Sequence, residues 1–152
     1  MAHIQQSAVR NRLLKVMTGE DFARLQSHLE PVDLLVDQTL IEANIRTEYL
    51  YFLESGLGSI TADGTNGRVE IGIIGREGVV GASHVLLGSD RVPYRHFVQM
   101  AGHALSIRAG IVSAAVDESP TLRKLLLRYV LTEMIQVRQT AIVNATFEIE
   151  VR

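Results

Sequence analysis

Between residues 31 and 107 the chain consists of about eight short apolar segments separated by turn residues, and this pattern constrains the fold most. Asp63-Gly64 and Asn66-Gly67 are dipeptides that favour tight hairpins, and the segment after them alternates as a half-buried strand does. Asn44 suits a left-handed turn position. Short strands at regular spacing are typical of a closed or two-sheet β body. The clearest predicted strands cover residues 32–36, 40–44, 48–53, 57–62, 68–74, 95–100 and 103–107.

Helices are predicted on both sides of this β region. Residues 7–17 form one candidate, and a second begins at Thr18, where Thr18 and Asp21 approximate a capping box. We expect Pro31 to end this second helix, because proline cannot continue the helical hydrogen-bond ladder. After the strands, residues 108–116 form a further short helix.

A long helix is predicted from Ser119, its N-cap, to about residue 148, with Pro120 at the first helical position. One apolar stripe at its start consists of Leu122, Leu125, Leu126 and Tyr129. A second stripe follows a strict heptad spacing and consists of Leu127, Val130, Met134, Val137, Ala141 and Asn144. Two stripes need two partners, so we expect the second to be a dimer seam in which Asn144 fixes the register. The alternative is that both stripes pack on the β body.

Composition excludes several classes of protein. At 152 residues the chain has the size of one domain, and its net charge of −2 is not the basic surplus of a free-standing nucleic-acid-binding domain. It contains no cysteine, which excludes disulfides, thiolate metal sites, iron–sulfur clusters and cysteine nucleophiles. Without a membrane-length apolar run or a signal-peptide pattern, the chain is expected to be soluble and cytoplasmic.

The segment from Ile74 to Val98 is the expected ligand site. It holds four of the twelve glycines and the polar cluster Ser89-Asp90-Arg91. Glycine lets backbone N–H groups approach a ligand closely, and binding residues concentrate on segments of this kind.

Two motifs resemble the Crp/Fnr family of bacterial transcription regulators. Residues 51–60, YFLESGLGSI, resemble a strand–turn–strand of cyclic-nucleotide-binding domains, and residues 73–81, IIGREGVVG, match that family's lead-in to its phosphate-binding cassette. The resemblance extends from about residue 12 to residue 152. It implies an α+β fold: a mainly β sensor domain over residues 1–118, a β-roll of about eight strands with N-terminal helices, and a C-terminal dimerisation helix over residues 119–152. It also implies a homodimer that binds DNA through a helix-turn-helix domain outside this chain.

The resemblance carries few of the family's ligand contacts over to this sequence. In the family, Gly-Glu begins the cassette, Arg followed by a hydroxyl residue ends it, and a pair of hydroxyl residues on the long helix contacts the adenine. Gly81 matches the glycine, but the other positions fall on Ala82, Val92, Pro93, Val137 and Arg138. The candidate cassette residues are therefore Gly81, Ala82, Ser83, Arg91, Val92 and Pro93, with Val137 and Arg138 facing the ligand from the helix.

Arg91 lies one residue from the family's arginine position. A shift of the loop could bring it to an anion, but we favour a solvated charge partnered by Asp90. We therefore expect that the domain does not bind cyclic AMP in the usual way, and the effector stays open. A ligand between Gly81 and Arg91 would repack the helix around residues 134–141 and reorient the two subunits.

Two other functions stay open. One is a stand-alone or degenerate module that regulates a protein partner. The other is a cupin-like metalloenzyme using His84, His96 and His103, although their spacing lacks the H-x-H pattern that brings two ligands onto one strand face. We predict no catalytic residues, no metal site and no placed haem ligand, and therefore a protein that is not an enzyme.

Overall fold

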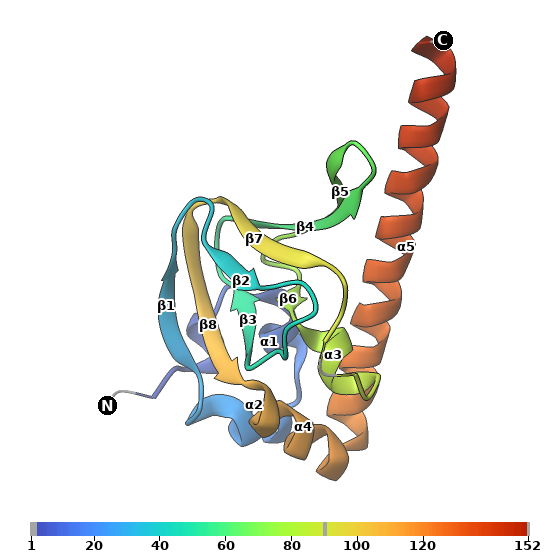
Figure 1. Ribbon diagram of the computed structural model, residues 1–152. Helices are drawn as coiled ribbons and strands as arrows, with labels where there is room; N and C mark the ends of the chain where they lie inside the picture. Colours follow the sequence, from blue (N-terminus) through green and yellow to red (C-terminus); the bar gives the residue numbers. More distant parts are fainter. Residues whose placement is uncertain (1–2, 90, 152) are drawn as a thin grey trace.

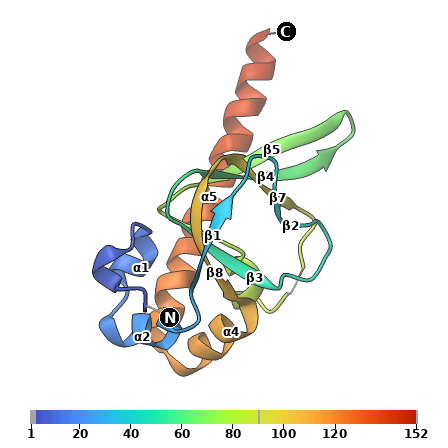
Figure 2. The same ribbon diagram turned by 90° about the vertical axis from the view of Figure 1, so that its left-hand side faces the viewer.

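The structure is a computed structural model that describes residues 3–89 and 91–151, and within them it contains eight antiparallel strands in two four-stranded sheets (Figures 1 and 2). The first sheet has the order β1-β8-β3-β6, formed by Glu30–Leu34, Gly102–Arg108, Tyr49–Leu53 and Val79–Val80. The second has the order β2-β7-β4-β5, formed by Thr39–Ile41, Arg95–Met100, Leu57–Gly64 and Gly67–Ile74. Together the sheets form the two-sheet β body that the strand pattern predicts and the β-roll that the family resemblance implies.

Turn chemistry sets the register of the longest hairpin. Strands β4 and β5 pair with Gly64 opposite Gly67, so Thr65 and Asn66 form the tight turn. Gly67 has φ +113°, a conformation that glycine adopts without steric cost. Asn44 has φ +61°, which confirms the predicted left-handed position.

The predicted first helix over residues 7–17 is wrong, because it is two pieces. A 3-10 turn, η1 (Gln6–Ala8), is followed by extended chain and then by α1 (Arg12–Val16). The extended residues cannot be helical because the backbone N–H groups of Arg10 and Asn11 donate to Glu54 Oε2, each at 2.6 Å. Asn11 then caps α1 by accepting from the N–H groups of Leu13 and Leu14.

The expected role of Pro31 is also wrong. Helix α2 (Gly19–Gln26) begins with the predicted Thr18 cap but ends five residues before Pro31, which lies in β1 opposite Leu105. Strand β1 is at the edge of its sheet, and an edge strand tolerates the missing N–H of proline.

The glycine-rich segment contains two elements that its sequence did not predict. Strand β6 is two residues long, and helix α3 (Ala82–Leu86) follows it directly. Gly81 makes the sharp bend between them with φ +102°, and the space beside its Cα is closed by Leu50, Ile41 and Thr47. Gly81 is therefore a backbone requirement of this corner.

Helix α4 (Ala109–Glu118) leads into the long helix α5 (Pro120–Val151), which runs along one side of the β-roll and extends beyond it (Figure 1). Ser119 caps α5 as predicted, because its Oγ accepts from the N–H of Leu122 at 3.2 Å.

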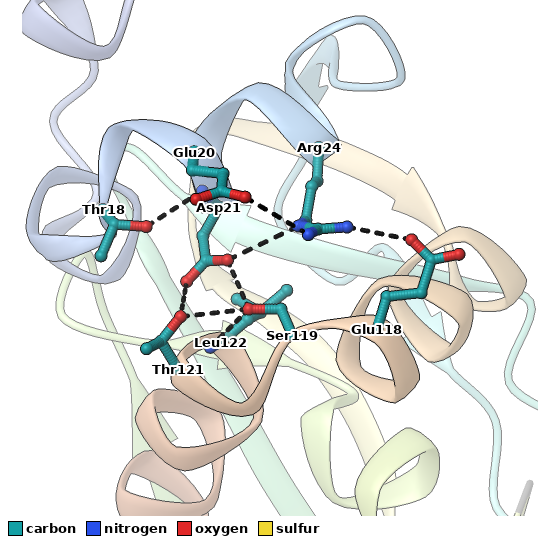
Figure 3. A network of polar contacts seen from close by, with 8 residues as sticks. All are labelled: Thr18, Glu20, Asp21, Arg24, Glu118, Ser119, Thr121 and Leu122. Carbon is teal, nitrogen blue, oxygen red and sulfur yellow. Dashed lines mark hydrogen bonds and ion pairs between the residues drawn. The ribbon is translucent and has the colours of Figure 1, made fainter.

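Asp21 fastens helix α2 to the start of helix α5 (Figure 3). Its buried carboxylate accepts hydrogen bonds from Ser119 Oγ at 2.5 Å and from Thr121 Oγ1 at 2.6 Å, and Arg24 bridges from Asp21 to Glu118. Burial alone would raise the pKa of Asp21, but these hydrogen bonds and the charge of Arg24 lower it overall. The network therefore fixes the start of α5 against helix α2.

Helix α5 presents two different apolar faces. Leu122, Leu126 and Val130 are buried in the core shared with α1, α2 and α4, and Val137 lies over Gly72 of β5. An outer face is exposed and consists of Leu127, Leu131, Met134, Ile135 and Ile142. The predicted seam therefore mixes both faces: Leu127, Met134, Ala141 and Asn144 are exposed, whereas Val130 is 5% exposed and packs within the chain. The reason is geometric, since residues three apart on an α-helix lie about 60° apart around its axis, so the two lines of the heptad face different surroundings.

Candidate functional site

A cavity of about 240 Å³ lies between the β-roll, helix α3 and helix α5, and we name it the roll–helix cavity. It is lined by Ile60, Ile71, Ser83, Leu87, Val92, Tyr94, His96, Val130, Glu133, Met134, Val137 and Arg138. Strands β4, β5 and β7, helices α3 and α5, and the loop before β7 thus supply its walls. Most of the surface is aliphatic, and a few polar groups point into it, which is the usual character of a small-molecule site.

Glu133 brings an acid into this apolar wall. Burial raises the pKa of Glu133 to about 7, although a hydrogen bond from Tyr129 partly offsets this effect. Tyr129 itself packs over the backbone of Gly78, where no side chain would fit, and burial raises its pKa as well. Since ionised carboxylates are rarely buried without a cationic partner, Glu133 is a group that stability alone does not explain.

His96 is the second buried polar group of the cavity. Its side chain stands on β7 and is 5% exposed, and burial together with the charge of a protonated His84 lowers the pKa of His96 to about 4. The two rings meet edge to face with their centroids 6.0 Å apart. Near neutral pH the imidazole of His96 is therefore uncharged.

The predicted cassette residues do not converge on one site. Ser83 and Val92 line the roll–helix cavity, but Ala82 is buried in the core and does not reach it. Arg91 lines a separate hollow with Arg46 and Thr47, and Pro93 lines a small cleft near β2. Asp90, the expected partner of Arg91, lies outside the described residues.

The two predicted helix positions both reach the cavity. Val137 and Arg138 line it from α5, but a valine and an arginine cannot reproduce the two hydroxyl contacts that the family resemblance implies. Among the described residues that line the cavity, Arg138 is the only permanently charged cation, and it stands on the exposed side of the helix. A cyclic phosphate would thus find no buried arginine where the resemblance places one.

Among the polar residues that line the cavity, sequence reasoning did not name Tyr94 or Glu133 as site residues, and it named His96 only as a possible metal ligand. Glu133 had a signal, because it follows Leu126 by seven residues on the same helical line and interrupts an otherwise apolar stripe. His96 and Tyr94 lie within the segment from Ile74 to Val98 that the sequence indicates as the ligand site, but no spacing singled out either residue.

The three histidines of the cupin-like alternative do not meet. His84 and His96 are neighbours, but His103 lies exposed on β8 with its Nδ1 2.9 Å from Asp33 Oδ1. The described part of the chain contains no group of three or more histidine, cysteine, aspartate or glutamate side chains placed to hold a metal. Within residues 3–89 and 91–151, no helix combines the length and apolar character that crossing a membrane requires.

No family model matches the sequence, and no curated protein sequence matches it either. Solved structures do match. The c-di-GMP-responsive global regulator CLP of Xanthomonas campestris superposes with a TM-score of 0.66 at 14% identity, over 82% of this chain and 63% of that one. The N-terminal domain of a transcriptional regulator from Streptomyces coelicolor gives 0.59 at 18% identity, covering 86% and 93%. A cyclic nucleotide-binding domain from Methylobacillus flagellatus gives 0.66 at 13% identity, covering 91% and 84%.

These similarities establish the fold. The chain has the β-roll and terminal helix of cyclic nucleotide-binding domains, as the sequence motifs predict. It spans less than two thirds of the Xanthomonas regulator, so that protein's activity as a whole does not transfer.

Proposed function

We propose that this chain is the effector-sensing part of a transcription regulator built on the cyclic nucleotide-binding fold. One observation carries the proposal: the roll–helix cavity has walls from the β-roll and from α5 at once. A molecule that enters it contacts both, so its binding free energy depends on how the helix lies against the roll. A ligand shifts a conformational equilibrium only through such a difference in affinity between two arrangements.

The output of the sensor is helix α5. Met134 lines the cavity and also belongs to the exposed outer face, so a change in the cavity reaches that face through one side chain. On the outer face Leu131 is 57% and Ile135 50% exposed, more apolar surface than a solvated helix needs. We propose that a second copy of the chain covers it through its own α5.

The regulators that share this fold are described as acting on gene expression, which supports the same role here. In this proposal the protein works in the cytoplasm, and a helix-turn-helix domain outside residues 1–152 contacts DNA. We assign no catalytic step to the cavity.

Light scattering on the purified chain tests the dimer. We expect twice the mass of one chain at micromolar concentration, and Ile135→Glu to reduce it to a single mass, because a charge would be buried between the helices. Gln136→Glu is the matched control, since it adds the same charge to an exposed neighbouring position outside the outer face. A wild-type monomer, or a dimer that survives Ile135→Glu, would contradict this arrangement.

A further inference from the structure

A second hollow, of about 550 Å³, lies where helix α3, the start of helix α4 and two loops meet, and we name it the arginine hollow. It is lined by Arg46, Thr47, His84, Val85, Gly88, Ser89, Arg91, Ala109, Gly110 and Ser113. All of these residues lie in helices or loops rather than in strands. The described residues of its wall include two permanently charged arginines and no aspartate or glutamate. The hollow is therefore locally positive, although the whole chain has a net charge of −2.

Backbone hydrogen bonds hold the two arginine-bearing loops together. The loop between β2 and β3 carries Arg46, and the loop before β7 carries Arg91. The N–H of Asn44 donates to the carbonyl of Val92 at 2.8 Å, which joins the two loops close to both arginines. Within the second loop, Ser89 Oγ donates to the carbonyl of Arg91 at 2.8 Å. The fold thus brings two cations from distant parts of the sequence to one hollow.

The start of helix α4 forms the third side of the arginine hollow. The N–H of Ala109 donates to the carbonyl of Glu48 at 2.8 Å, which fixes the helix to the end of the first loop. The N-cap residue is Arg108, whose side chain makes no capping hydrogen bond. Gly110, at the second helical position, lines the hollow, and its N–H has no acceptor within the helix. The positive end of the helix therefore adds to the field of the two arginines.

The arginine hollow is separate from the roll–helix cavity, although helix α3 borders both. Ser83 lines the cavity, whereas its neighbour His84 lines the hollow. Neither Arg46 nor Arg91 lines the cavity. A ligand of the hollow consequently makes contacts that a ligand of the cavity does not.

We propose that the arginine hollow binds the phosphate group of a small soluble molecule, as a second site beyond the proposed sensing cavity. Guanidinium groups match phosphate oxygens in bidentate geometry, and N–H groups at a helix start supply further donors. Ser89 and Ser113 also line the hollow, and their hydroxyl groups suit the polar remainder of a phosphate ester. A compact molecule fits a concave site of about 550 Å³, whereas a long polyanion would be repelled by the net negative charge of the chain.

Matched probes isolate the contribution of the phosphate. Ribose 5-phosphate and ribose differ by that group alone, and inorganic phosphate is the minimal probe. We expect ribose 5-phosphate to bind the chain at least about tenfold more tightly than ribose at low ionic strength, the equivalent of one charge-assisted hydrogen bond. The backbone amide resonances of Arg91 and Gly110 should shift with both phosphate probes and stay constant with ribose. This readout uses the wild-type chain and needs no variant to fold.

Two substitutions assign the binding to the arginines. Arg46→Gln and Arg91→Gln should each weaken the binding of ribose 5-phosphate by about tenfold, and both replace exposed loop residues outside the core. Arg123→Gln is the matched control, because it removes the same charge from an exposed position on α5 that does not line the hollow. Its affinity for ribose 5-phosphate should equal that of the wild type.

Three results would overturn the proposal. The first is equal binding of ribose 5-phosphate and ribose, and the second is a loss of affinity in Arg123→Gln as large as in the two hollow variants. The third is tighter binding to a short single-stranded oligonucleotide, or to vesicles that contain phosphatidic acid, than to ribose 5-phosphate. None of these results bears on the proposed sensing function, whose own test is the response of Met134 in the roll–helix cavity.

Discussion

Replacing Glu133 by glutamine should stabilise the protein above neutral pH. Burial raises the pKa of Glu133 from the ordinary value of 4.5 to about 7, so the folded state holds a proton that the unfolded state has released. Stability therefore falls as pH rises from about 4.5 to about 7 and levels off above that. Each pKa unit corresponds to 1.36 kcal/mol, which makes the loss about 3 kcal/mol.

The glutamine variant removes this loss, because its amide is neutral at every pH and keeps an acceptor for Tyr129. Urea unfolding between pH 4.5 and pH 8 measures the difference in free energy of unfolding between Glu133→Gln and the wild type. We expect a difference near zero at pH 4.5 that grows to about 3 kcal/mol at pH 8, or about 6–12 °C in Tm. His96 titrates near this site in both proteins, so its contribution cancels in the difference.

Glu42→Gln is the control, because Glu42 is exposed and its removal should leave the pH dependence unchanged. A difference between Glu133→Gln and wild type that stays constant over this pH range would refute the reasoning. So would a variant that is less stable than wild type at pH 8.

Other substitutions test how α5 is held. Asp21→Ala should cost about 3 kcal/mol at pH 7 by urea unfolding, because it removes the acceptor of two short hydroxyl hydrogen bonds, while Glu20→Ala should cost under about 0.5 kcal/mol. The pKa of Asp21 is lowered in the folded state, so the stabilisation by its ionised carboxylate is present above about pH 4. Below that pH the free energies of unfolding of Asp21→Ala and wild type should converge. A difference in stability that persists in acid would count against this network. Gly78→Ala should destabilise by about 2 kcal/mol in thermal unfolding, since its Cβ would occupy the space of the Tyr129 hydroxyl. Gly110→Ala places a Cβ in open space and should not destabilise, so equal losses in both variants would contradict the packing.

The overall fold could be predicted from sequence because its signals are local. The Asp-Gly and Asn-Gly turns, the Ser119 cap and the alternating segment 68–74 each specify structure within a few residues. The errors arose where a contact with a residue far away in the sequence determines the local backbone conformation. Glu54 accepts hydrogen bonds from the backbone N–H groups of Arg10 and Asn11, and this contact interrupts the predicted first helix. The periodicity of residues 7–17 contains no sign of it.

The site was harder to predict for the same reason. The family resemblance points to a cassette between Gly81 and Pro93, but the structure divides those residues among the core, two hollows and the roll–helix cavity. His96 and Glu133 meet at the cavity only because residues of α5, β4, β5 and β7, far apart in the sequence, surround the same space. Sequence spacing identified the helix but not which of its faces meets the roll.

The most direct test of sensing is the methyl resonance of Met134 during titration with three probes: the compact, largely apolar molecules indole and indene, and cyclic AMP. Met134 lines the cavity on α5, whereas Met17 is buried in the helical core and Met100 is exposed at the end of β7, and neither of these lines the cavity. We predict that a bound probe shifts Met134 in proportion to saturation and leaves Met17 and Met100 unmoved. A Met134 signal that stays constant with all three probes, or shifts only at Met17 or Met100, would contradict a cavity that reports to helix α5.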